Sequence, residues 1–528
     1  MKKECLKLLP LAIVAATLSA CGSDSSSSGS SNSGNNDGDK KTANIGSGIH
    51  LKKGSEGVFV NSLIIGDYAE CLYLDDNTVL TPASDTSSNP QDNIKNIYGH
   101  CVEAVNAGDS GYTVELAGHG ASFAALDDKL AATGTSAVSA TITSEEVDGS
   151  ASNAQNLSAN PNFSFDNTTY VGAVDPAAST AWHAFALTGS VPATAAAVDV
   201  TPGSYDAAFE PNVTFTPNMT GVTPATDCPA APTGARITKL STTYELDGQS
   251  FIACELSGDI MSDFTLNDEV VWTLVGRVVV GNGNVELNAS NPTPASVSLT
   301  IDAGTVLMSA NGSSLVITRG SEINAIGTAA RPIVMAGDKT KTFGGTGEWG
   351  GLVLQGYAYH NKCGLSDTYC NRSGEGDTGS FAGYDNADSS GTLQYVIVTE
   401  AGAIVNGDGD ELNGIGFMGV GYGTTVDYVQ VHGNADDGVE FFGGAVDAKH
   451  LVLTANQDDN IDWDEGYVGN IQYALIVQTQ NQAKTSNHAF ELDTAGDAND
   501  SATQESNPTV ANVTAIASLS KKDVGLED

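Results

Sequence analysis

The fold is decided by two stretches that repeat each other, Val429-Gln-Val-His-Gly-Asn-Ala-Asp-Asp-Gly-Val-Glu-Phe441 and Leu451-Val-Leu-Thr-Ala-Asn-Gln-Asp-Asp-Asn-Ile-Asp-Trp463. Each position of the first stretch has its counterpart 22 residues later (451 − 429 = 22). A unit of this length is typical of one rung of a parallel β-helix and is too short for a propeller blade of about 40 residues. Rungs bury their inward aliphatic side chains only against neighbouring rungs, so stacking aligns like residues in ladders.

Short apolar runs of the same kind recur from about residue 256 onward, separated by Gly, Asn and Asp turns. A weaker third copy begins at Leu475 and reaches Asn487-His488 after extra residues. Convincing amphipathic helices are absent from the sequence pattern, and regularly spaced short strands indicate an all-β fold. We therefore predict a right-handed parallel β-helix over residues 226–528. The sequence contains no signal for a terminal cap before Asp528, which leaves open whether the chain is a fragment.

The N-terminus has the three regions of a bacterial export signal. Lys2 and Lys3 precede an apolar stretch from Leu8 to Leu18, which is too short to span a bilayer. The stretch ends in Leu18-Ser-Ala-Cys21, which resembles the lipobox of bacterial lipoproteins. This resemblance implies a signal peptide over residues 1–20 and acyl chains, such as palmitate, on Cys21. More than one buried chain gives stable membrane anchoring.

The composition changes twice after Cys21. Residues 21–46 are Ser, Gly, Asn and Asp with almost no apolar side chain, which predicts a disordered tether. Residues 47–225 are rich in Ala, Thr, Ser, Asn and Asp and contain short β-like runs. We interpret them as an irregular β-rich or mixed N-terminal domain before the β-helix.

The formal net charge of −42, with 22 Lys and Arg residues, makes nucleic acid an unexpected partner, because phosphate neutralisation needs basic clusters. Eight cysteines are present. Cys5 would leave with the signal peptide and Cys21 would be acylated, so six remain in an oxidising compartment. Six cysteines allow 15 connectivities. The assignment by proximity in sequence is Cys71–Cys101, Cys228–Cys254 and Cys363–Cys370.

Four segments together resemble a family of bacterial surface lipoproteins: Trp272–Gly281, Leu299–Leu307, Gly347–Gly356 and Asp436–Gly444. The resemblance covers about residues 225 to 528. It implies a pectin-lyase-like parallel β-helix and a lipid-anchored place at the outer membrane, on its periplasmic or cell-surface face. The family is largely without a defined activity, so the resemblance supports the fold far more than a function.

Acidic residues at the ends of the repeated rungs are the main candidates for chemistry. Stacking would bring Asp436 and Asp437 about 5 Å from Asp458 and Asp459. Carboxylates at that spacing do not all stay ionised without a cation or a proton. Calcium, which prefers carboxylate and carbonyl oxygens, is one answer. The candidate ligands are Asp436, Asp437, Asp458, Asp459, Asp462, Asp464 and Glu465.

Acid–base chemistry is the second answer, because paired carboxylates carry out glycoside hydrolysis. The order Asn-x-Asp, Asp-Asp and His is similar to pectin-degrading hydrolases, and it implies a catalytic set of Asp436, Asp458, Asp459 and His488. The sequence departs from that pattern, because His488 lacks flanking glycines and the later Arg-x-Lys is absent. A third interpretation is structural: Asn and Asp are common turn residues that cap rungs.

Weaker signals complete the set. The stretch from Asn406 begins like an EF-hand loop but has Phe417 where Glu is required. Trp463 and Tyr467 fit core packing better than sugar stacking. A loop with Glu491, Asp493, Asp497 and Asp500 fits solvated acids.

The leading functional hypothesis is non-catalytic binding of a glycan, a matrix component or a partner envelope protein along the β-helix. A polysaccharide hydrolase or lyase and a calcium-stabilised structural spacer are the alternatives. The sequence does not specify the oligomeric state.

Overall fold

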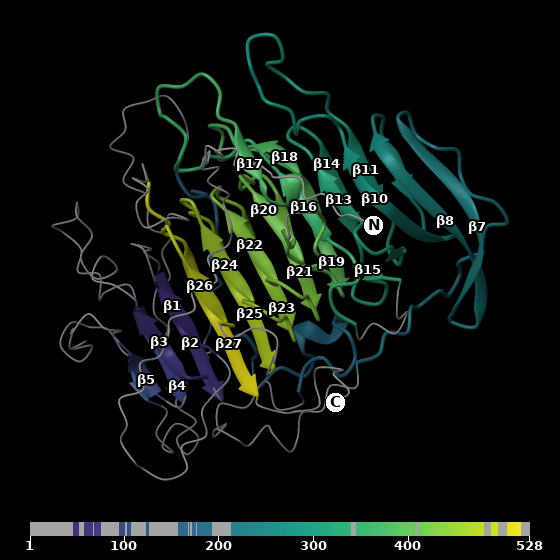
Figure 1. The fold of residues 1–528 in the computed structure, drawn as a ribbon. Helices are drawn as coiled ribbons and strands as arrows, with labels where there is room; N and C mark the ends of the chain where they lie inside the picture. Colours follow the sequence, from purple (N-terminus) through teal and green to yellow (C-terminus); the bar gives the residue numbers. More distant parts are fainter. Residues whose placement is uncertain are drawn as a thin grey trace, which may run out of the picture.

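A computed structural model describes the protein over most of its β-rich regions (Figure 1). The described residues are 46–51, 58–66, 68–74, 94–100, 103–106, 123–125, 157–192 without 167, 169, 171 and 176, 213–338, 345–406, 410–479, 487–494 and 504–518. Almost every element among them is a β-strand, and no described helix is long and apolar enough to cross a membrane. The predicted lipidation site at Cys21 lies outside these residues.

The strands form a parallel β-helix with three stacks, which we call faces A, B and C. Face A contains β9 (Phe264–Leu266), β11 (Ser298–Ile301), β14 (Glu322–Ile326) and the first halves of β19 (Gly391–Thr399), β21 (Thr425–His432), β23 (Asp447–Thr454), β25 (Asn470–Thr479), β27 (Thr509–Ser518), β2 (Val58–Gly66) and β4 (Ile94–His100). Face B contains the first halves of β8 (Gln249–Ile260) and β10 (Val271–Val280), then β12 (Val306–Ser309) and β15 (Ile333–Gly337). It continues with the second halves of β19, β21, β23, β25, β27, β2 and β4, and ends with β6 (Phe123–Ala125).

Face C contains the second halves of β8 and β10, β13 (Ser314–Ile317), β16 (Gly351–Gln355), β20 (Ile415–Met418), β22 (Val439–Phe442), β24 (Ile461–Asp464), β26 (Phe490–Leu492), β1 (Ile49–Leu51), β3 (Glu70–Leu74) and β5 (Glu103–Asn106). Among the described strands, two pairs are antiparallel. β7 (Ala235–Leu246) pairs with β8, and β17 (Arg372–Gly374) pairs with β18 (Gly379–Phe381).

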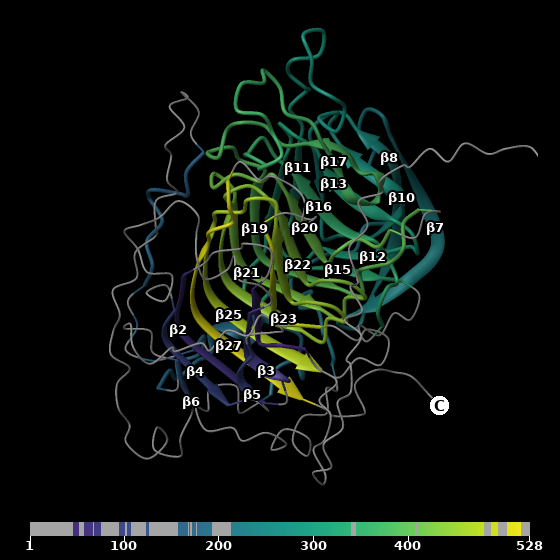
Figure 2. The same cartoon turned by 60° about the vertical axis from the view of Figure 1, so that its left-hand side comes forward.

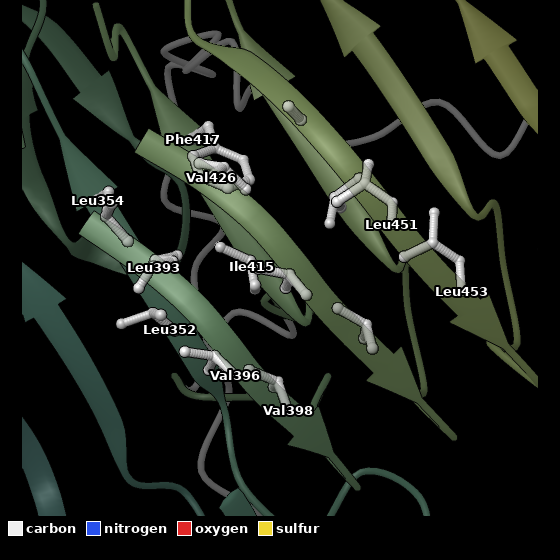
Figure 3. Packing of buried hydrophobic residues seen from close by; sticks show 14 of the residues in the cluster. Leu352, Leu354, Leu393, Val396, Val398, Ile415, Phe417, Val426, Leu451 and Leu453 are labelled. Carbon is white, nitrogen blue, oxygen red and sulfur yellow. The ribbon is translucent and has the colours of Figure 1, made fainter. Parts of the chain in front are cut away.

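The strand register confirms the repeat that predicts the fold. Val429 pairs with Leu451 and Val439 pairs with Ile461, which is the same offset that separates Asn434 from its hydrogen-bond partner Asn456. Inward side chains of the three faces form one continuous core, part of which Figure 3 shows. Alternation along each strand sends one residue into this core and the next outward. The predicted all-β parallel β-helix is therefore confirmed.

Aromatic side chains stack along the bend between faces A and B. Tyr395, Tyr428, His450 and Tyr473 all have positive φ there. Their ring centroids lie 4.5, 4.2 and 4.8 Å apart in that order. Residues with a Cβ rarely adopt this backbone conformation. The stacked rings offset that cost by packing against one another, because aromatic pairs add stability beyond simple burial.

The N-terminal strands continue the β-helix past its last C-terminal strand. β2 pairs in parallel with β27, and β1 pairs in parallel with β26. Figures 1 and 2 both show β2 and β4 beside β27 and β25. The described strands between residues 47 and 125 thus extend the same sheet. Strand β2 forms hydrogen bonds with the outer edge of β27. The N-terminal strands thus cover the edge for which the sequence pattern contains no cap signal.

A second N-terminal segment lies outside the β-helix, on face A near residue 165 and on face B near residues 185–187 and 219. We call residues 157–192 and 213–222 the strap. Phe185, Leu187 and Met219 of the strap pack on outward aliphatic residues of face B. The backbone N–H of Leu187 donates to Gln430 Oε1 at 2.7 Å, and that of Ala173 donates to Thr514 Oγ1 at 2.8 Å. The strap therefore covers the outward aliphatic residues of face B and also pairs with its outward polar residues Gln430 and Thr514.

Two of the predicted disulfides are present. Cys228 is bonded to Cys254 and Cys363 to Cys370, with Cα–Cα distances of 5.8 and 5.6 Å. Cys71 is buried, and its predicted partner Cys101 lies outside the described residues, so that pairing stays a prediction.

Candidate functional site

The outward column of face C changes character halfway along the β-helix. Its residues, taken strand by strand in register, are Val279, Val316, Val353, Gly416, Glu440, Asp462, Glu491, His50 and Tyr73. The three valines belong to a cluster that the disulfide-bearing loop of residues 357–384 covers. Beyond Gly416 the column becomes ionisable, and we call Glu440, Asp462 and Glu491 the acidic row. The row begins where the apolar covering ends.

The acidic row lies on three successive strands. Neighbouring strands in a sheet are about 4.8 Å apart, so each carboxylate faces a like charge on the next rung. All three residues are half-buried, which leaves them open to solvent while the protein restricts their hydration. His50 follows next in the column, with its Nδ1 3.5 Å from Oε1 of Glu491. The row is therefore a concentrated negative strip on the outside of the β-helix.

A buried amide links this strip to a loop acid. Asn413 is 1% exposed, and its Nδ2 donates to Oε2 of Glu375 at 3.1 Å and also to Oε2 of Glu440. Among the described residues, Asn413 Oδ1 has no hydrogen-bond partner. Arg277 donates to the backbone carbonyls of Gly376 and Asp377 and so holds the Glu375 loop in place. Glu375 thereby extends the strip sideways.

Burial and mutual repulsion raise the pKa of several of these carboxyl groups. The pKa of Glu440 is raised well above its ordinary value by burial first, and then by the charges of Glu375 and Asp462. The pKa of Asp437 is raised in the same way by burial and by Asp436 and Asp462. Such groups favour either a proton or a cation among them.

The turn between faces B and C carries a hydrogen-bond ladder. Oδ1 of Asp437 accepts the backbone N–H of Asp459 at 2.9 Å, and Oδ1 of Asp459 accepts the backbone N–H of His488. Nδ1 of His488 accepts the backbone N–H of Ser47 at 2.6 Å. Each side chain thus caps the N–H at the same position of the next rung. This is the structural role that Asn and Asp at rung ends predict.

The ladder determines the chemistry open to His488. Its Nδ1 lone pair is occupied by the Ser47 N–H, so the neutral ring carries its proton on Nε2. A ring in that state offers no lone pair to a metal, although His50 and Glu491 lie close enough to form a group with it. Asp459 and His488 are 3% and 5% exposed. Both residues therefore serve to join successive rungs by hydrogen bonds.

Two groups of oxygen ligands lie beside the ladder. Carboxylate oxygens of Asp436, Asp437 and Asp458 lie within 4.8 Å of one another, and so do those of Asp437, Glu440 and Asp462. Asp437 belongs to both groups. Oxygen atoms alone, at this spacing, form the ligand set that Ca²⁺ prefers.

Asp464 and Glu465, also predicted as metal ligands, belong to a separate cluster. Nε2 of His360 contacts Oε2 of Glu465, and Nζ of Lys362 lies 2.9 Å from its Oε1. Burial would raise the pKa of Glu465, but His360 and Lys362 together lower it to about 2. Glu465 is therefore satisfied by two basic partners. Burial and the charge of Glu465 raise the pKa of neighbouring Asp464.

Sequence reasoning missed Glu375, Asn413 and Glu440. The repeat contained a signal for Glu440, since it occupies the same position of its rung as Asp462 does one rung later. Nothing in the sequence signalled Glu375, which reaches the row from a loop between rungs.

The remaining weak signals have structural places. Trp463 and Tyr467 are fully buried, as core packing predicts. Nδ2 of Asn406 donates to Oδ2 of Asp410 at 2.8 Å, and residues 407–409 lie outside the described part. Glu491 is in the acidic row and Asp493 is buried, whereas Asp497 and Asp500 lie outside the described residues.

Comparison with protein families matches residues 258–526 to the pectate-lyase-like β-helix domain family. The match spans just over half of the chain, and the chain belongs to this family. A comparison with curated proteins gave no significant match, and neither did a comparison with solved structures.

Proposed function

We propose that this chain is a lipid-anchored envelope protein that binds an anionic glycan, without catalysis, through a divalent cation held by Asp437 together with Glu440 and Asp462 of the acidic row. The observation that carries the proposal is the change along face C, where a covered apolar column gives way to Glu440, Asp462 and Glu491. A negative strip repels an anionic glycan unless a cation lies between them. A cation with open coordination positions resolves both the repulsion within the strip and the repulsion of the ligand.

Calcium fits the available donors. Asp437, Glu440 and Asp462 present only oxygen atoms, within 4.8 Å of one another. Asn413 adds a buried amide at the edge of the group. Hard cations take six to eight such oxygens, and a site with three protein carboxylates leaves positions for a ligand and water.

Binding without catalysis is favoured because two of the hydrolase-like residues, Asp459 and His488, form hydrogen bonds between rungs. Asp459 accepts the N–H of His488, and His488 accepts that of Ser47. A general acid or base must reach the substrate proton directly or through one water. Asp459 and His488 are buried and cap rungs, so these two residues do not meet this requirement.

The anchor is proposed from the sequence. Cys21 would carry the acyl chains, and the segment from Gly22 to Gly46 would separate the lipid from the first described rung. The absence of an aspartate directly after Cys21 favours the outer membrane over the inner membrane, by resemblance to known lipoproteins.

The test of the proposal is calcium titration of the full chain by calorimetry, followed by a glycan array with calcium or with chelator. We expect Glu440→Gln to weaken calcium binding at least about tenfold, or about 1.4 kcal/mol. Glu245→Gln makes the same charge change on exposed β7 and serves as the matched control. Calcium binding that is equal in both variants contradicts the assignment. An array that stays empty with calcium points to a protein partner instead.

A polysaccharide-active enzyme is the second candidate, and membership of the pectate-lyase-like family favours it. Its test is the release of reducing ends or unsaturated products from acidic and neutral polysaccharides. We expect no release above buffer. Release that disappears in Asp458→Asn or Glu440→Gln, while folding is unchanged, establishes the enzyme and removes the non-catalytic proposal.

A further inference from the structure

The C-terminal end of the β-helix is an acceptor surface for an N-terminal segment of the same sequence. We call residues 46–51 and 58–66 the donor segment and the edges of β26 and β27 the acceptor edges. β1 of the donor segment pairs with β26 from Ile49 to Leu51, and β2 pairs with β27 on both faces A and B. Successive rungs such as those of β22 and β24 are joined by a single coil of the chain, whereas Gly46 and Asn487 are 441 residues apart.

The acceptor edges recognise the donor segment through specific polar contacts. Oδ1 of Asn487 accepts the backbone N–H of Gly46 at 3.1 Å, and Nδ1 of His488 accepts that of Ser47 at 2.6 Å. Gly46 is required there, because a Cβ would lie 2.6 Å from the His488 ring. These contacts set the register in which the segment joins the edge.

Apolar contacts add most of the burial. Ile49, Leu51, Phe59 and Ile64 of the donor segment are all at most 5% exposed and belong to the main core. Burying these side chains removes apolar surface from water and so stabilises the pairing. Without the donor segment, β26 and β27 would expose both a core end and unpaired backbone groups, which promotes pairing with another chain.

We propose that the acceptor edges also take the donor segment of a second copy of this chain, which makes the surface an assembly site. The donor segment makes the same contacts whether it binds its own chain or a second copy. Neither arrangement therefore has more hydrogen bonds or apolar contacts than the other. Exchange of an identical element is a low-cost route to association. The balance depends on the protein concentration relative to the effective concentration of the attached segment.

The geometry of exchange determines the kind of assembly. Reciprocal exchange between two copies closes a dimer, whereas one-way donation from each copy to the next is a heterologous contact. Heterologous contacts that do not close into a ring extend as open filaments. The donor segment directly follows the predicted tether, so copies anchored in one membrane would present their segments at the same height.

Paired cysteine variants of the full chain test this proposal. Val60 and Ala511 are register partners on neighbouring strands, and both are buried away from the acidic row. Neighbouring strands are about 4.8 Å apart, within the Cα–Cα range of a disulfide. A chain with both Val60→Cys and Ala511→Cys should form the link within one monomer.

The decisive arm mixes two chains, one with Val60→Cys and a heavy-isotope label, the other with Ala511→Cys. They are unfolded together, refolded over a range of concentrations, oxidised and mapped by mass spectrometry. We expect a link between labelled and unlabelled chains that rises about tenfold for each tenfold increase in dilute protein, as mass action requires. Leu63→Cys with Thr514→Cys, the next register pair, repeats both arms if the first pair fails to fold.

Two outcomes overturn the proposal. Links that form only within monomers at every concentration show that the acceptor edges do not take a second copy. The control replaces Ala511→Cys with Ala253→Cys, because Ala253 lies on β8 at the other end of the β-helix. Links to Val60→Cys that form equally well with this control show unspecific association.

Discussion

Oδ1 of Asp437 accepts the backbone N–H of Asp459 at 2.9 Å, one rung further along the β-helix. The same contact recurs from Asp459 to His488 and from His488 to Ser47. Two aspartates at the same position of the repeat and one histidine after the insertion therefore do one structural task. The ladder joins the repeated rungs to the irregular third copy and then to the N-terminal rung.

The ladder predicts how substitutions of Asp459 affect stability. Asp459→Ala leaves the buried N–H of His488 without its acceptor, which costs about 1–3 kcal/mol of unfolding free energy. Asp459→Asn keeps an acceptor oxygen. It also removes a carboxyl group whose pKa is raised, first by burial and then by the neighbouring charges of Glu491 and Asp458. We expect it to be as stable as the native chain. Denaturant unfolding of both variants measures this, and equal losses in the two would contradict the ladder.

The strap predicts a second effect, at Gln430. Its Oε1 accepts the N–H of Leu187 and its Nε2 donates to Ser190 Oγ, all without exposure to solvent. We expect Gln430→Ala to release this part of the strap while the β-helix remains folded. Hydrogen exchange of peptides around residue 187 should then become faster, with strands β19 to β23 unchanged. Unchanged exchange in the strap would show that its apolar contacts suffice.

The repeat made the β-helix predictable, because the constant offset and the inward aliphatic pattern are both visible in adjacent segments. The place of the N-terminal strands was not predictable in this way. β1 pairs with β26 near the other end of the chain, and no local pattern records such a pairing. Glu375 was missed for a related reason. Leu352 on β16 pairs with Ile415 on β20, and the long insertion between these two strands, which carries Glu375, interrupts the repeat.

The predicted anchor makes a direct prediction for Cys21. Cys21→Ser removes the thiol that would take the acyl chains, so we expect the chain to leave the membrane fraction of the producing cell. Labelling with a radioactive or clickable fatty acid should mark the native chain and not the variant. Cys5→Ser, within the predicted signal peptide, is the matched control and should keep the label. A membrane-bound, labelled Cys21→Ser chain would move the anchor elsewhere.

Stability should depend on pH with a sign that Asp437, Glu440 and Glu375 determine. In chelator, burial and neighbouring charges raise the folded pKa of Asp437, Glu440 and Glu375, whereas unfolded carboxyls titrate near about pH 4. Between those values the folded state binds more protons, so the unfolding free energy falls as pH rises.

Glu465 acts in the opposite direction, since its pKa is lowered to about 2 and its contribution is lost only as pH falls below about 4.5. We therefore expect the greatest stability in chelator near about pH 5 and a decline toward about pH 8. Glu440→Gln should flatten that decline and Glu245→Gln should not, as denaturant unfolding across this range will measure. Stability that rises toward pH 8 in chelator would mean that these carboxyls titrate at or below their ordinary values.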